Sequence, residues 1–195
     1  SNANQADADK DGVGDACDSC EAANPGATPC VLAISTVRNP QASGHPKTTT
    51  AVSVEGYVSA REAPPGTTHF FYVQEGLTGA PWQGIFILAD GLAGSSTTGP
   101  KLGQKVKVTG VHQEIFSVNQ ITAATVTVTS PTQEIMVPLD VTAAQVNTAA
   151  GAGAEPYESL LVRIGGAASS IVITNDNPDS GKFFEFVVTG NLRLD

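Results

Sequence analysis

Alternation of hydrophobic and polar residues dominates the middle of the chain and predicts a run of β-strands. Val52 and Val54 alternate with polar neighbours, and the same two-residue period recurs as far as residue 129. Alternate side chains of a strand point to opposite faces, so one face of each segment is expected to enter a core. The pattern predicts five strands, over residues 51–60, 69–75, 84–90, 104–116 and 121–129.

Glycines inside two of these segments indicate how the sheet is expected to curve. Gly56 and Gly110 interrupt their strands, and an interior glycine typically marks a bulge or a sharp bend. The last two strands are predicted to form a hairpin. Bent strands close a small sheet on itself, so we expect a mainly β fold with a five-stranded barrel. An immunoglobulin-like sandwich is the alternative, although it usually buries a tryptophan, whereas Trp82 lies in a turn.

Shorter patterns flank the five strands. Residues 31–37 alternate well enough to predict a lead-in strand, and proline and glycine predict a loop over residues 39–49. Thr142 and Gln145 have the spacing of a capping box, which predicts a short helix over residues 143–149. Strand patterns return over residues 157–195. Those strands are expected to complete the packing of the first barrel; the alternative is an edge open to another chain.

Composition limits the functions that the chain can have. The 195 residues are 41% hydrophobic and 15% charged, which fits one or two small folded domains and excludes a charge-rich disordered protein. No apolar segment is long enough to span a membrane. The net charge is -9, and the 13 acidic and 9 basic residues beyond position 30 leave the β region acidic. An acidic surface is poorly suited to holding a polyanion.

The strongest chemical signature lies in residues 7–18. Aspartates occupy positions one, three, five, nine and twelve of this segment, with glycine at position six. This is the ligand spacing of a twelve-residue calcium loop, in which position seven contributes a backbone carbonyl. A disordered acidic linker is the alternative. The spacing predicts one Ca²⁺ site formed by Asp7, Asp9, Asp11, Val13, Asp15 and Asp18.

All three cysteines lie within the first thirty residues. An odd number indicates either a partner elsewhere or a thiol outside any disulfide. Zinc would need four ligands, and no second cysteine pair or nearby histidine completes such a site. Structural disulfides in an oxidising compartment fit better, which predicts a secreted or cell-surface protein.

The segment NQADADKDGVGDACDSC resembles the thrombospondin type 3 repeat. The resemblance covers residues 4–30, after residues 1–3, which have the sequence of a cloning remnant. It implies a disulfide between Cys20 and Cys30, with Cys17 directed to a repeat further upstream. A Cys17–Cys20 bond is the alternative. The resemblance also implies that neighbouring repeats and domains of one parent protein are partners.

Five short motifs of the β region are similar to OB-fold modules that accompany secreted bacterial nucleases and related surface proteins. They are VSVEGYV, FFYVQE, GIFIL, LGQKVKVTGVHQEI and NQIT, and the resemblance covers residues 31–130. It implies no catalytic residue. By the same resemblance, residues 131–195 contain a short helix and strands of a second, truncated OB-like barrel.

No motif of an active site is present, so we expect a protein without catalytic activity. His45, His69 and His112 share no spacing, and scattered histidines are usually surface or strand residues. Our leading hypothesis is a calcium-binding spacer or binding module of a secreted or surface bacterial protein. The alternatives are a nucleic-acid-binding accessory domain of an extracellular nuclease, and a carbohydrate or protein adhesion module.

A nucleic-acid site would use aromatic side chains on the outer face of one strand. Phe70 and Tyr72 are the candidates for stacking, with Gln74 beside them, and Lys105 and Lys107 are the candidates for phosphate contacts. The alternative, which we favour, is that these aromatics pack beneath residues 157–195. The turn-forming residues 175–179 lack the ladder of a second calcium loop.

Overall fold

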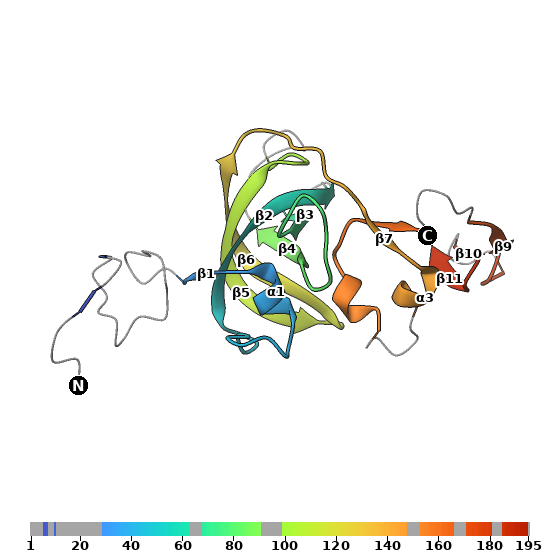
Figure 1. The fold of residues 1–195 in the computed structure, drawn as a ribbon, viewed down its shortest axis with the longest axis horizontal. Coiled ribbons are helices and arrows are strands. Elements are labelled where there is room, and N and C mark those ends of the chain that lie inside the picture. The colour runs from blue at the N-terminus through green and yellow to red at the C-terminus, as the bar shows by residue number, and fades with distance from the viewer. Residues whose placement is uncertain are drawn as a thin grey trace.

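The fold is mainly β, with one large sheet and two small ones (Figure 1). The computed structural model describes residues 6–7, 10, 29–62, 68–90, 99–147, 153–165, 171–180 and 185–194. The large sheet contains β1 (Val31–Leu32), β2 (Ala51–Glu62), β3 (Thr68–Gln74), β4 (Gly84–Asp90), β5 (Lys105–Ile115) and β6 (Val118–Ser130). The five long strands lie where the alternation predicts them.

The large sheet is mixed, and its strand pairings form a circuit. Its order is β1-β2-β3-β4-β6-β5, and β2 also pairs with β5. The β4–β6 and β1–β2 pairs are parallel, and the others are antiparallel. Each strand from β2 to β6 therefore has a partner on both sides. The β4–β6 contact is the shortest link, with two residue pairs, Phe86↔Gln120 and Ile87↔Ile121.

The inward side chains of these strands form one apolar core. The core side chains of β2 to β6 are at most 6% exposed, and the short helix α1 (Ile34–Arg38) adds two more apolar side chains. Each fully buried aliphatic or aromatic side chain stabilises the fold by about 1.5–3 kcal/mol. The core comprises Ile34, Val37, Val52, Val54, Val58, Phe71, Val73, Ile85, Ile87, Ala89, Val106, Val108, Ile121 and Ala124.

The prediction of a lead-in strand over residues 31–37 is wrong after Leu32. Ala33 has an extended backbone and precedes α1. Ile34 and Val37 are three residues apart, which places both on one face of a helix, and both are 0% exposed. The same apolar residues fit a strand period and a helix period over so short a segment, and burial against the sheet selects the helix.

The two strand glycines have different structural roles. The β5–β6 register shifts between Thr109 and Val111, so the bulge predicted at Gly110 is confirmed. No shift occurs at Gly56; a Cβ atom there would lie 2.5 Å from the Gln74 carbonyl oxygen, so glycine permits close contact of β2 with β3. The β5–β6 hairpin is confirmed, and positive φ angles at both residues of its turn (φ 53° and 63°) match a two-residue turn.

The C-terminal part forms small sheets of its own. β7 (Leu139–Val141) pairs with β8 (Val162–Ile164), while β9 (Ile173–Asn175), β10 (Phe186–Val188) and β11 (Leu192–Leu194) form a three-stranded sheet. None of these described strands joins the large sheet, and their expected role in completing the packing of the first barrel stays a prediction. Contact with the large sheet comes from connecting segments, through hydrogen bonds such as Val137 N–H to Leu77 O (2.8 Å).

Helical structure in the C-terminal part is shorter than predicted. The predicted capping box is present, with Thr142 and Gln145 bonded reciprocally, and helix α3 spans Ala143–Val146. Residues 148–149 of the expected helix lie outside the described residues. A 3-10 helix, η1 (Glu155–Tyr157), includes the first residue of the region over which strands were predicted. No helix in the described ranges has the length and apolarity needed to cross a membrane.

Candidate functional site

The predicted calcium loop falls largely outside the described residues. Asp7 and Lys10 are described, whereas the predicted ligands Asp9, Asp11, Val13, Asp15 and Asp18 are not. The calcium site therefore stays a prediction. Within the described ranges, no three His, Cys, Asp or Glu side chains lie close enough together to hold a metal ion.

The junction between the predicted repeat and the sheet is well described. Cys30 takes part in a disulfide bond, and the predicted partner, Cys20, lies outside the described residues. The next two residues form β1, in which Val31 pairs with Ser53 and Leu32 with Val54. Helix α1 follows with its apolar side chains in the core. The chain thus passes from the disulfide into the sheet without an intervening loop.

Three aromatic side chains, which we term the aromatic row, lie together on the outer face of β3 and β4. Phe70 and Phe86 are stacked with ring centroids 5.8 Å apart, and Tyr72 is tilted against Phe86 at 5.2 Å. All three are half-buried. Alternation places Phe70 and Tyr72 on this face correctly, and the same period in GIFIL identifies Phe86, which we did not predict.

Residues 159–162 cover one end of this face. Gln74, expected beside the aromatic row, is 0% exposed. Its Oε1 accepts a hydrogen bond from Leu161 N–H (3.2 Å), and its Nε2 donates to Gly76 O (3.0 Å). A cavity of about 350 Å³ separates Tyr72 from the covering segment. The outer face is therefore partly occupied by the C-terminal segment, in the way that our favoured alternative predicts for the whole face.

The candidate lysines do not join the aromatic row. Lys105 and Lys107 pair with Tyr57 and Glu55 in the middle of β2, whereas the aromatic row lies beside the C-terminal end of that strand, near Ala60 and Glu62. Lys105 Nζ is also 3.0 Å from Glu55 Oε2, so an acidic group offsets its charge. These two lysines and the aromatic row therefore do not form one patch.

The most elaborate polar arrangement was not predicted. We term it the buried polar cluster, and it consists of Arg38, His112, Asn119, Glu155 and Glu158. Arg38 lies at its centre with a side chain that is 0% exposed. Its Nη1 is 2.9 Å from Glu155 Oε1 and 2.8 Å from Glu158 Oε2, and its Nη2 donates to Glu155 O (2.8 Å). This guanidinium therefore ties α1 to the η1 segment.

Further contacts extend the cluster into the sheet. Arg38 Nε donates to Gly84 O (2.9 Å), and the guanidinium lies 5.9 Å from the ring centre of Trp82. Trp82 N–H donates to Pro156 O (2.6 Å). At Gly84 an added Cβ would lie 2.4 Å from Ser159 O, so the backbone just after η1 lies directly against the β4 backbone. The cluster thus docks residues 154–161 onto the large sheet.

His112 and Asn119 connect the β5–β6 hairpin to the same segment. Asn119 Nδ2 donates to Glu155 Oε1 (3.2 Å), and its Oδ1 lies 3.0 Å from His112 Nε2. His112 was expected to be an ordinary surface or strand residue, but it is a strand residue that is 1% exposed. Its second ring nitrogen, Nδ1, is buried and makes no hydrogen bond within the described part of the chain.

Burial shifts the pKa values of two groups of the cluster in opposite directions. Burial lowers the pKa of His112, and its hydrogen bond to Asn119 opposes that shift. Burial raises the pKa of Glu158, and the charge of Arg38 only partly compensates. Both shifts favour the neutral forms. Sequence reasoning missed this cluster because Arg38 and Glu155 are 117 residues apart and no local spacing links them.

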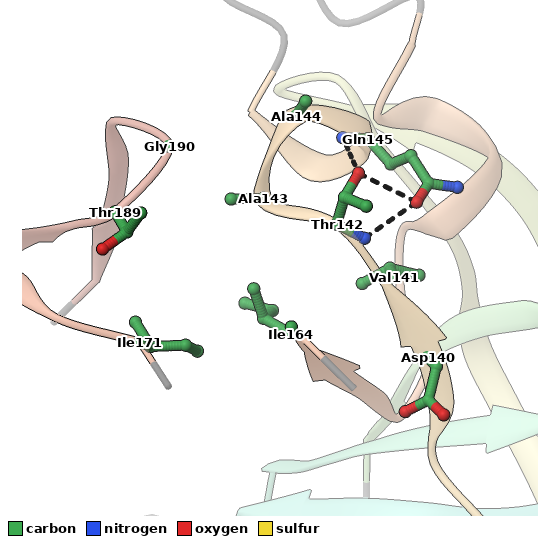
Figure 2. A pocket seen from close by; sticks show the side chains of 11 residues that line it. Asp140, Val141, Thr142, Ala143, Ala144, Gln145, Ile164, Ile171, Thr189 and Gly190 are labelled. Atoms are coloured by element: carbon green, nitrogen blue, oxygen red, sulfur yellow. Dashed lines mark hydrogen bonds between the residues drawn. The ribbon is translucent and has the colours of Figure 1, made fainter. Parts of the chain in front are cut away.

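A separate cavity of about 520 Å³ lies in the C-terminal part (Figure 2). Its walls are mainly apolar and include Val141, Ile164 and Ile171. The polar side chains of Thr142 and Gln145 bond to each other in the capping box, as the dashed lines in Figure 2 show. These two groups are therefore already satisfied, and we assign the cavity no ligand.

No protein-family model matches the chain, and no curated protein matches it.

Proposed function

We propose that the chain is a non-catalytic calcium-binding joint of a secreted or surface protein, in which residues 7–18 hold one Ca²⁺. The attachment of residues 30–38 to the large sheet is the observation that carries this proposal. A disulfide at Cys30, strand pairing in β1 and burial of α1 follow one another without a gap. A repeat stiffened by calcium would transmit its orientation directly to the β domain through such a junction.

We further propose that the large sheet is an OB-type barrel. The circuit of pairings from β2 through β3, β4, β6 and β5 back to β2 supports this, as does the parallel β4–β6 pair. The bulge at Gly110 and the single apolar core inside the circuit are also what a small barrel needs. A barrel would give the joint a rigid body at its C-terminal side.

Calorimetric titration of chelator-stripped protein tests calcium binding. We expect uptake of one Ca²⁺ with a Kd of about 10⁻⁴–10⁻³ M, the range of extracellular modules. Asp18 at position twelve has a shorter side chain than the usual glutamate, which fits the weaker end of calcium affinities. Asp9→Ala and Asp11→Ala each remove a predicted ligand and are expected to abolish the uptake.

The aromatic row supports a second candidate, binding of single-stranded nucleic acid. Three adjacent rings on one outer face are the arrangement on which bases stack. The separation of Lys105 and Lys107 from the row, and the acidity of the chain, make this the weaker candidate. Carbohydrate or protein adhesion at the same row is a further alternative, because neutral ligands also stack on aromatic rings.

Fluorescence anisotropy with labelled single-stranded DNA at low salt tests the second candidate. Binding is expected to weaken with added salt, and Tyr72→Ala and Phe86→Ala should each weaken it by about 1–3 kcal/mol per lost stacking contact. Phe116→Ala is the matched control, since Phe116 is 98% exposed in the hairpin turn and lies outside the row. Equal binding by wild type and Tyr72→Ala, or no binding at all, would exclude this role for the row.

A further inference from the structure

The imidazole of His112 has one bonded and one unbonded nitrogen in a buried position. Asn119 Nδ2 donates to Glu155, so Asn119 Oδ1 is the acceptor that faces His112 Nε2. The proton of the neutral ring therefore resides on Nε2. Nδ1 keeps its lone pair, and it is buried without a hydrogen-bond partner among the residues that the structure describes. A second proton can bind only at this atom.

Loop 39–50, between α1 and β2, covers the ring. Both backbone polar groups of His112 bond to this loop: Thr49 N–H donates to His112 O (2.7 Å), and His112 N–H donates to Thr50 O (2.9 Å). The ring of His45, from the same loop, stands edge-on with its centroid 5.9 Å away. His45 Nδ1 in turn lies 3.3 Å from Thr36 O of α1.

The groups around the ring disfavour a positive charge on it. Arg38 of α1 and His45 of the loop both act against protonation, in the same direction as burial. The hydrogen bonds to Asn119 of β6 and to the Lys47 backbone favour the charged form, but burial, His45 and Arg38 together outweigh them. Among the described residues, hydrogen bonds link the Glu155 carboxylate to His112 only through Asn119.

We propose that loop 39–50 is a pH-released cover, which closes over neutral His112 and opens when Nδ1 is protonated. Protonation would place a cation in a buried site that already contains the Arg38 guanidinium, and the Lys47 backbone compensates only part of that cost. Opening the loop gives Nδ1 access to water and separates His112 from His45. Since α1 leads directly into this loop, opening also loosens the contacts that hold α1 and residues 154–161 together.

The pH range follows from linkage. The folded-state pKa of His112 lies below its ordinary value of 6.5, so the open state binds more protons between those two values. The closed state is therefore fully favoured above pH 6.5 and loses stability as the pH falls below it. Glu158 opposes this change, because its raised pKa makes the closed state take up a proton more readily than the open state, down to its ordinary value of 4.5.

Amide hydrogen exchange in the full chain tests the cover. We compare the exchange rates of the Thr49 and His112 amides at about pH 7.5 and about pH 5.5, after correction for the intrinsic effect of pH on exchange. The equilibrium constant for opening of the loop should rise by up to about tenfold for each pH unit below the ordinary pKa of histidine. His112→Gln keeps a donor for Asn119 and cannot titrate, so its loop should show no such rise. His69→Gln is the matched control and should behave as wild type.

The same rise in wild type and His112→Gln would overturn the proposal, as would equal protection of wild type at both pH values. A second measurement does not depend on a variant that folds. Titration of the His112 imidazole by NMR should give a midpoint below 6.5, with the amide signals of loop 39–50 changing at the same pH. A midpoint at or above this value, with the loop amides unchanged, would also overturn it. Neither experiment requires calcium, so its outcome is independent of the proposed joint.

Discussion

Replacing Arg38 with alanine is expected to lower the free energy of unfolding by about 3–5 kcal/mol, the usual cost of breaking a buried ion pair on one side. The guanidinium is 0% exposed and satisfies two carboxylates and two backbone carbonyls. Its removal leaves Glu155 and Glu158 facing each other without a cation. Urea denaturation monitored by circular dichroism measures the change, provided that the slope of the transition is unchanged.

Arg163→Ala is the matched control for this prediction. Arg163 also binds a carboxylate through two nitrogens, with 2.6 Å and 2.8 Å contacts to Asp140, but both side chains are exposed. Exposed ion pairs contribute little to stability because water and salt screen them. We therefore expect a small effect. Comparable losses in the two arginine variants would contradict the assignment of Arg38 as a buried anchor.

Phe71→Ala is expected to destabilise the β domain by about 3–5 kcal/mol, the range found for large-to-small changes of buried aromatic residues. Phe71 is 2% exposed and packs in the apolar core inside the circuit of strands. Its loss removes apolar contacts and leaves a cavity that the surrounding strands cannot fill by moving. Urea denaturation again measures the difference.

The neighbouring residue gives a control within the same strand. Phe70 points to the outer face and is half-buried, so Phe70→Ala should lower stability much less while removing part of the aromatic row. If Phe70→Ala were the more damaging change, the assignment of inner and outer faces in β3 would be wrong.

The contrast between Phe70 and Phe71 shows what could be predicted from the sequence. A two-residue period assigns faces without knowledge of the partner strands, so the five long strands and most of the core follow from alternation. The bulge at Gly110 follows from the same local logic. At residues 31–37 this logic fails, because Ile34 and Val37 satisfy either period and only the tertiary contact with the sheet decides between them.

The candidate sites also differ in how much of each could be predicted from the sequence. The calcium spacing in residues 7–18 is entirely local, and the sequence is therefore sufficient to propose it. The distance between Lys107 and the aromatic row depends on strand register, which places Lys107 opposite Glu55. Arg38, Glu155 and Glu158 meet only because the C-terminal segment docks beside α1. No pattern in the sequence anticipates such a contact.

Calcium titration of chelator-stripped wild type beside two aspartate variants tests the central proposal most directly. Asp11→Ala removes a predicted ligand, and Asp176→Ala removes an exposed aspartate from the turn at residues 175–179, where an Asx-type bond links Asn177 N–H to Asn175 Oδ1. We expect one saturable site at about 10⁻⁴–10⁻³ M in wild type and in Asp176→Ala, and none in Asp11→Ala. Absence of uptake by wild type at millimolar calcium, or undiminished uptake by Asp11→Ala, would contradict the proposed joint.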